Sequence, residues 1–317
     1  CVSSNNDLDE LIETLNQKSI ISFDTETTSL NPLEAELIGI SFGHGPNLAS
    51  YIPLGHNQKK NLNKKEVLKK IKIILEDKSI KKVGQNIKYD FLIMKKEGIE
   101  INSFEDTMLL SYTLDAGLNR HNLDELAELH LNHKNISFKD LVGSGKKKLT
   151  FGQIDLKKAT EYAGEDADVT LRLYDLFKER VDQEKLNMIY DSLEKPMVKL
   201  LSKMELKGIK IDPSYLKKLS KKFNEKINQL EKEIYKIAGK TFNIGSPKQL
   251  GEILYNDLKI SNLKKTKKGS LATSAKVLED LALNGHKFPS LVLEWRGLTK
   301  LKNTYSDALQ DHINSRT

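Results

Sequence analysis

The sequence predicts a mixed α/β domain followed by a mostly α-helical region. In the first 90 residues, short β-branched and apolar runs typical of strands are interleaved with segments of helical periodicity. After Lys185 the strand signals nearly vanish. The charge changes at about the same place: residues 1–190 contain 26 basic and 30 acidic residues, whereas residues 191–317 contain 25 and 14. We therefore expect two regions with different tasks.

The composition is that of a globular protein of about two domains. With 38% hydrophobic and 30% charged residues, and with 18 Gly and 7 Pro in 317 residues, collagen, low-complexity disorder and a disulfide scaffold are excluded. The single cysteine, Cys1, cannot pair within the chain, which indicates a reducing compartment. No apolar run is long enough to span a membrane, and the N-terminus lacks the features of a signal peptide. We expect a cytoplasmic protein without a membrane anchor.

The sequence of the first region predicts a meander of strands followed by helices. β-branched and apolar runs bounded by turn residues predict strands, and apolar residues at helical spacing predict helices. Gly98 is expected to end the helix that begins at about residue 88. The predicted strands are 20–24, 37–42, 49–53 and 81–84, and the predicted helices are 64–75 and about 88–97. From Asp106 onward the pattern is mostly helical, with breaks at Gly117 and at 142–145.

The sequence of the second region predicts helices over almost its whole length. Pro196 suits the first turn of one helix, and Ser246 and Pro247 suit the cap and first position of another. The predicted helices are 193–206, 213–238, one opening at Ser246-Pro247, 275–283 and 289–309. The excess of basic residues indicates a polyanionic partner, with nucleic acid the commonest large one. An AT-rich genome would raise lysine generally, but it does not explain an imbalance confined to one region.

One loop of the second region concentrates positive charge. It has four lysines and no acid, and such a run is usually only a solvated loop. In a basic helical region it is equally consistent with contact to phosphates. The lysines are Lys264, Lys265, Lys267 and Lys268.

The sharpest chemical signal is Asp24-Thr25-Glu26 at the end of the first predicted strand. Residues two apart on a strand point to the same face, so two carboxylates meet there. Their repulsion would raise one pKa, and a hard divalent cation such as Mg²⁺ would relieve it. Taken alone, a solvated strand end explains this pair better.

Two further segments carry acids in suggestive places. Tyr162 and Asp166 are four apart on a predicted helix, so they share a face, and the Tyr could hold a water beside a metal bound by the carboxylate. A Tyr packed at a domain edge beside an exposed Asp is the simpler interpretation of that pair alone. Asp90 follows a strand–Gly–helix transition whose free N–H groups suit a phosphate, although it could equally be a favourable acid at a helix start.

Together these segments give four carboxylates and one Tyr on three separated elements. Paired metal ions that clamp both oxygens of an in-line displacement are used by polymerases and nucleases. The segments resemble the three motifs of the DnaQ-like (DEDD) 3′–5′ exonucleases, and the Tyr four before the last Asp is typical of the DEDDy subclass. The set is Asp24, Glu26, Asp90, Tyr162 and Asp166.

The resemblance extends over nearly the whole chain. Further segments of the first region resemble the proofreading domain of the bacterial family-A DNA polymerases of the polymerase I type. Segments of the basic helical region resemble the thumb and first helices of the polymerase domain in the same family. The first group is 84–90, 106–109, 120–124, 149–151 and 162–170, and the group in the helical region is 208–212, 248–250 and 295–305.

This resemblance implies a ribonuclease H-like exonuclease domain over 1–187 and the N-terminal part of a polymerase domain over 188–317. It implies two divalent metal ions, most simply Mg²⁺, with Mn²⁺ or Zn²⁺ as alternatives. Asp24 would bridge both metals, Glu26 and Asp166 would complete one site, and Asp90 would hold the second metal. Tyr162 would orient the attacking water.

The resemblance also implies contacts with DNA. Leu30 would wedge against the terminal base, Phe138 would stack near the 3′ end, and Asn86 and Arg120 would lie near the terminal nucleotide. Leu30 could instead be plain core and Arg120 a surface ion pair. A single-stranded 3′ end would occupy the exonuclease site, duplex backbone would lie at the thumb, and the protein is expected to be a monomer.

The palm and fingers of the family should follow residue 317, and a 5′-nuclease domain usually precedes, so the chain is expected to be the middle of a longer polymerase. Two other functions remain open. Some members keep the fold without metal ligands and serve as DNA-binding scaffolds, which the complete ligand set argues against. An RNase D-like exoribonuclease shares the site type, which the thumb-like region argues against.

Overall fold

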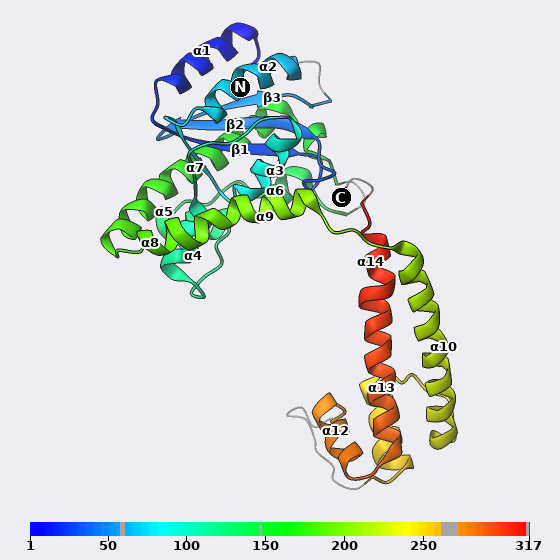
Figure 1. Ribbon diagram of the computed structural model, residues 1–317. Coiled ribbons are helices and arrows are strands. Elements are labelled where there is room, and N and C mark those ends of the chain that lie inside the picture. The colour runs from blue at the N-terminus through cyan, green and yellow to red at the C-terminus, as the bar shows by residue number, and fades with distance from the viewer. Residues whose placement is uncertain (58–60, 146–147, 261–271, 315–316) are drawn as a thin grey trace. The chain divides into compact units, whose positions relative to one another are not determined.

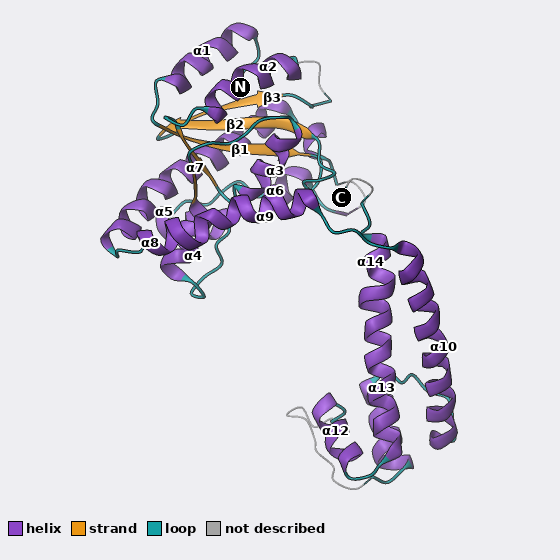
Figure 2. Ribbon diagram, viewed as in Figure 1, coloured by secondary structure: helices purple, strands orange, loops and turns teal. Residues whose placement is uncertain are grey.

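The structure is a computed structural model that describes residues 1–57, 61–145, 148–260, 272–314 and 317. The chain forms two compact units, Cys1–Gly208 and Ile209–Thr317 (Figure 1). The first unit combines a sheet with helices and the second is helical, which confirms the predicted fold class (Figure 2). Among the described residues, no helix combines the length and the apolar character that a membrane crossing needs.

The sheet of the first unit has five strands in the order β3-β2-β1-β4-β5. β1 is central; it pairs antiparallel with β2 and parallel with β4, and β5 continues the parallel side. The three predicted meander strands are therefore confirmed, and β1 extends beyond its predicted end so that Glu26 lies within it. The strands are β1 (Ile20–Thr27), β2 (Leu37–Gly45), β3 (Leu48–Pro53), β4 (Lys81–Gly84) and β5 (Phe104–Asp106).

Helices cover the two faces of this sheet. One face of β1 contributes Ile21 and Phe23 to a core shared with α1, α2 and α3. The other face is crossed by the long helix α7, which packs on β1, β2, β3 and β4. The helices of the first unit are α1 (Asn5–Asn16), α2 (Lys64–Glu76), α3 (Lys88–Lys96), α4 (Thr107–Asp115), α5 (Leu123–Leu131), α6 (Phe138–Val142), α7 (Leu156–Gln183), α8 (Asn187–Ile189) and α9 (Lys195–Lys207).

Two elements of the first unit were absent from the prediction. Helix α1 begins at a Ser4 capping box and buries Leu8, Leu11 and Leu15, the amphipathic pattern of a short surface helix. Strand β5 has only three residues, too few to show an alternating pattern. Asp106 at the end of β5 caps α4 and also accepts hydrogen bonds from the backbone of Asn86 and Ile87, which connects this strand to the site.

The end of the first unit lies beyond the predicted domain boundary at 187. Helix α9 packs against α3, and Val198 joins the same core as the sheet. Lys195 adds an ion pair to the buried Glu105 of β5, with 2.9 Å between Nζ and Oε1. Compact packing therefore continues to Gly208, where a positive φ of 66° ends α9.

The second unit has its own apolar core, to which Ile234, Leu250, Leu278 and Val292 contribute. Helix α10 packs along α13, and the indole of Trp295 donates a hydrogen bond of 3.0 Å to Glu231. The single helix predicted over 289–309 begins earlier and passes through a π-helical turn, η5. The elements are α10 (Pro213–Ala238), α11 (Pro247–Glu252), η4 (Ile253–Asp257), α12 (Ala275–Leu283), α13 (Lys287–Leu301), η5 (Lys302–Asp307) and α14 (Ala308–Asp311).

Candidate active site

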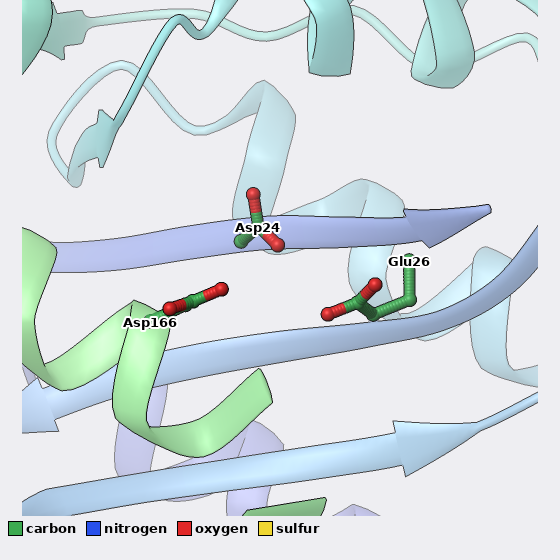
Figure 3. A group of neighbouring side chains, drawn as sticks. All are labelled: Asp24, Glu26 and Asp166. Atoms are coloured by element: carbon green, nitrogen blue, oxygen red, sulfur yellow. The ribbon is translucent and has the colours of Figure 1, made fainter. Parts of the chain in front are cut away.

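Three of the predicted carboxylates meet above the central strand. Asp24 and Glu26 project from one face of β1, and Asp166 reaches them from α7 (Figure 3). The carboxyl groups of Glu26 and Asp166 point toward one another. One oxygen of each residue lies within 4.8 Å of those of the other two, the spacing of ligands around a single cation.

Small residues let α7 approach the sheet closely enough to bring Asp166 there. Ala159, Ala163 and Ala167 recur every four residues and are fully buried against the strands. The hydroxyl of Ser22 donates a hydrogen bond of 2.6 Å to the carbonyl of Ala167, the residue next to Asp166. Gly43 of β2 faces the same carbonyl, and a Cβ there would lie 2.8 Å from its oxygen.

The fourth carboxylate, Asp90, comes from the first turn of α3 and is only 2% exposed. Its Oδ1 accepts two hydrogen bonds from Thr25, one from the backbone N–H at 3.0 Å and one from the hydroxyl at 2.5 Å. Thr25 lies between Asp24 and Glu26, so this pair of bonds ties α3 to the end of β1. Asp90 is thereby held beside the other acids, although it is not part of the three-carboxylate group.

Burial raises the pKa of every one of these acids, and the charges of neighbouring acids add to this at Glu26, Asp90 and Asp166. Burial is the main cause at Asp24, whose pKa rises to about 7. The pKa of Glu26 rises well above its usual range because of burial and then the charges of Asp24, Asp166 and Asp90. Burial and the charge of Asp24 raise the pKa values of Asp90 and Asp166 in the same way. Asp24 and Glu26 therefore each interact with the other three acids.

The acid cluster fits a divalent cation. Among the described residues, Glu26 Oε1 is a buried oxygen without a hydrogen-bond partner. Such an atom is costly to bury unless something outside the chain satisfies it. Clustered carboxylate oxygens are the ligands that Mg²⁺ and Ca²⁺ prefer, and a bound cation would reverse the repulsion among them.

The raised pKa values predict how pH and metal act on stability. A carboxyl whose pKa is raised by folding stabilises the folded state below its unfolded pKa and loses that effect as pH rises through the folded pKa. For Asp24 these values are 3.8 and about 7. The metal-free first unit should therefore lose stability as pH rises from about 4 toward 7, and Mg²⁺ should raise its melting temperature more at about pH 8 than at about pH 5.5. Thermal unfolding with Mg²⁺ or EDTA measures this, and an equal shift at both pH values would contradict it.

Tyr162 lies over the cluster from α7. Its side chain is partly buried, and burial together with the charges of Asp166, Glu26 and Asp24 raises the pKa of its hydroxyl far above the ordinary value. The hydroxyl therefore stays protonated at any working pH and can donate. The predicted spacing of four residues on one helix face is present in α7.

A cavity of about 720 Å³ opens beside the acids. Its apolar wall is formed by Phe138 and Phe151, whose rings are nearly parallel with centroids 6.5 Å apart, and by Tyr162, 5.8 Å and 6.0 Å from them. Leu30, 96% exposed, and Asn86 also line it. The structure thus gathers three of the four predicted nucleotide-contacting residues of the first unit around one cavity. Leu30 is clearly not core.

The remaining predicted contact residues are not in that group. Arg120 is exposed and does not line the cavity, and its backbone N–H donates to Glu125 at 3.1 Å. Its side chain makes no ion pair within the described ranges. The predicted lysine loop lies outside the described residues, namely Lys264, Lys265, Lys267 and Lys268.

Three residues that shape the site were not assigned a role from the sequence. Thr25 holds Asp90, and Phe151 completes the aromatic wall. The buried carboxylate of Asp106 accepts the N–H groups of Asn86 at 3.1 Å and Ile87 at 3.0 Å, and so holds Asn86 in its left-handed conformation at φ 56°. One sequence signal pointed to Asp106: aspartate is a common N-cap residue, and an apolar helical segment follows it.

Comparison with known proteins gives consistent matches over both units. A family model described as 3′–5′ exonuclease matches residues 1–182, and one described as DNA polymerase family A matches residues 213–317. Proteins named DNA polymerase I from Rhizobium leguminosarum and Pseudomonas aeruginosa are 44% and 39% identical, each over 98% of this chain. Those matches take up 32% and 35% of the relatives, so the chain spans about a third of their length.

A solved structure has the same fold at lower identity. It is described as the POL domain of Pol1 from M. smegmatis in complex with DNA primer-template and dNTP. It superposes with a TM-score of 0.81 and 23% identity, over 98% of this chain and 50% of that one.

Proposed function

Because this chain belongs to the 3′–5′ exonuclease family of the family-A DNA polymerases, we propose that its first unit removes nucleotides from the 3′ end of DNA. The reaction is hydrolysis of the terminal phosphodiester with release of a deoxynucleoside monophosphate. The observation that carries the proposal is the set of four acids beside a cavity with an aromatic wall, of which Glu26 and Asp90 are buried and Asp24 and Asp166 partly buried. The domain assignment, 1–187 exonuclease and 188–317 start of the polymerase domain, is part of the same proposal.

The acids are proposed as the metal-binding groups. Two divalent cations, with Mg²⁺ the best match to carboxylate ligands, would activate the attacking water and neutralise charge on the leaving 3′ oxygen. Asp24 would be shared between the two sites, in keeping with its effect on the pKa of each of the other acids. Glu26 and Asp166 would complete one site, and Asp90, held by Thr25, would serve the other.

The remaining residues would orient the reactants. The protonated hydroxyl of Tyr162 would position the attacking water for an in-line approach. Phe138 and Leu30 would hold the last base, and stacking of this kind tolerates any base. Asn86 lines the same cavity, and Arg120 is proposed to reach the terminal nucleotide from outside it.

The second unit is proposed to hold duplex DNA through its backbone. Residues 209–317 contain 21 basic and 11 acidic residues, and this excess favours phosphate contacts without sequence preference. Lys264, Lys265, Lys267 and Lys268 are proposed contacts in it. We also propose that the protein works as a cytoplasmic monomer.

The proposal is tested by a gel assay on a 5′-labelled single-stranded DNA. We expect a ladder that shortens from the 3′ end in Mg²⁺ and intact substrate in EDTA. An RNA of the same sequence should be degraded far more slowly, whereas equal or faster loss of RNA would favour an RNase D-like exoribonuclease. Intact DNA with retained binding would instead indicate a non-catalytic scaffold.

A further inference from the structure

The position of Phe138 in the cavity wall depends on the segment that precedes it. Residues 132–137 connect α5 to α6, and Phe138 is the first residue of α6. The side chain of Asn135 in this segment is 9% exposed, yet neither of its amide atoms has a hydrogen-bond partner among the described residues. The backbone of the segment is bonded to α5, where the N–H of His133 donates to the carbonyl of Ala127 at 3.1 Å, and further anchors come from side chains of other elements.

A single residue of α7 supplies two of these anchors. Oε1 of Glu165 lies 2.9 Å from Nε2 of His133, and Oε2 accepts the backbone N–H of Ile136 at 2.6 Å. The Glu165 side chain is 17% exposed, so both hydrogen bonds are partly protected from water. Two oxygens of one carboxylate thus fix two points of the segment, three residues apart, to one position on α7.

The location of Glu165 joins this anchor to the reacting groups. It directly precedes Asp166 and follows Tyr162 by three residues on α7. Phe138, two residues after Ile136, places its ring centroid 5.8 Å from that of Tyr162. Any movement of the segment away from α7 would therefore widen the aromatic wall while leaving the acids of β1 in place.

We propose that Glu165 is a positioning residue for the 3′-terminal nucleotide, which it controls by clamping the 132–138 segment to α7. This clamp rests on the proposed exonuclease function, because it assigns Glu165 to the binding of that same substrate. It acts through hydrogen bonds to the segment and not through the metal-binding acids.

The clamp predicts a change in substrate affinity with little change in turnover. Glu165→Ala should raise KM for single-stranded DNA about tenfold, as expected when stacking of one base is lost, with kcat within about twofold of the wild type. Glu165→Gln keeps an acceptor for Ile136 and should restore most of the affinity. Combining Glu165→Ala with Phe138→Ala should raise KM no further than Phe138→Ala alone, since both changes remove the same contact. Glu161→Ala, an exposed acid on the same helix, is the matched control and should match the wild type.

A second measurement is independent of activity. Hydrogen exchange at the Ile136 amide should accelerate at least about tenfold in Glu165→Ala and stay unchanged in Glu161→Ala. Unchanged exchange would overturn the clamp. So would a fall in kcat with a shifted Mg²⁺ requirement, because Glu165 would then act through the charge of Asp166. If the wild type cleaves no DNA, the proposed function fails, and the exchange measurement alone decides whether the clamp exists.

Discussion

Replacing Asp24 with asparagine is expected to lower the rate of DNA cleavage by about a thousandfold or more while the first unit stays folded. Asp24 contributes to the three-carboxylate group and raises the pKa of each of the other acids. Its loss would therefore weaken both proposed metal sites at once. Because the change also removes repulsion, the metal-free variant should be at least as stable as the wild type at about pH 8.

Single-turnover rates on labelled DNA in Mg²⁺, with thermal unfolding of the same samples, measure both parts of this expectation. Asp9→Asn is the control, because Asp9 is an exposed acid of α1 that pairs with Lys70. A wild-type rate for Asp24→Asn would remove the basis of the proposed function. A large loss of stability would show that Asp24 has a structural role instead.

Gly43→Ala is expected to lower both stability and activity, although Gly43 does not line the cavity. The new Cβ would lie 2.4 Å from the hydroxyl of Ser22 and 2.8 Å from the carbonyl oxygen of Ala167. Relieving that overlap requires α7 to move off the sheet or the Ser22 hydrogen bond to break, and overpacking of this kind costs about 1–3 kcal/mol. Because Asp166 adjoins Ala167, a displacement of about 1 Å would reduce cleavage about a hundredfold.

Urea unfolding and the cleavage assay measure these effects. Gly164→Ala provides the control on α7 itself, since its Cβ would make only an ordinary contact, 3.7 Å from Ala49. Alanine also favours a helix interior over glycine, so this variant should be as stable as the wild type or more stable. Equal behaviour of the two variants would mean that the contact at Gly43 does not position α7.

The sequence predicted the parts of the fold and site that depend on local pattern. The i, i+2 spacing of Asp24 and Glu26 placed them on one face of a strand, and the i, i+4 spacing of Tyr162 and Asp166 placed them on one face of a helix. Both arrangements are present. The family was also predicted correctly, because its motifs recur in order along the chain.

Features that arise from tertiary contacts could not be predicted in this way. The hydrogen bonds that Thr25 donates to Asp90 and that the Asn86 N–H donates to Asp106 join segments that no local pattern relates. Strand β5 is too short to show a period, and the π-helical turn η5 differs from a regular helix without a distinguishing composition. The roles assigned to Leu30 and Arg120 stay predictions, since they need DNA in the site.

The attachment of α7 to β1 also bears on how the protein acquires activity during its synthesis. Ser22 and Ala167, which bond at this junction, are 145 positions apart along the chain. The ribosome therefore completes Asp24 and Glu26 long before Asp166, and contacts between such distant segments form late in folding. A nascent chain that has not yet docked α7 lacks Asp166, one of the proposed metal ligands, so under the proposed function the emerging polypeptide would cleave no DNA before α7 is in place.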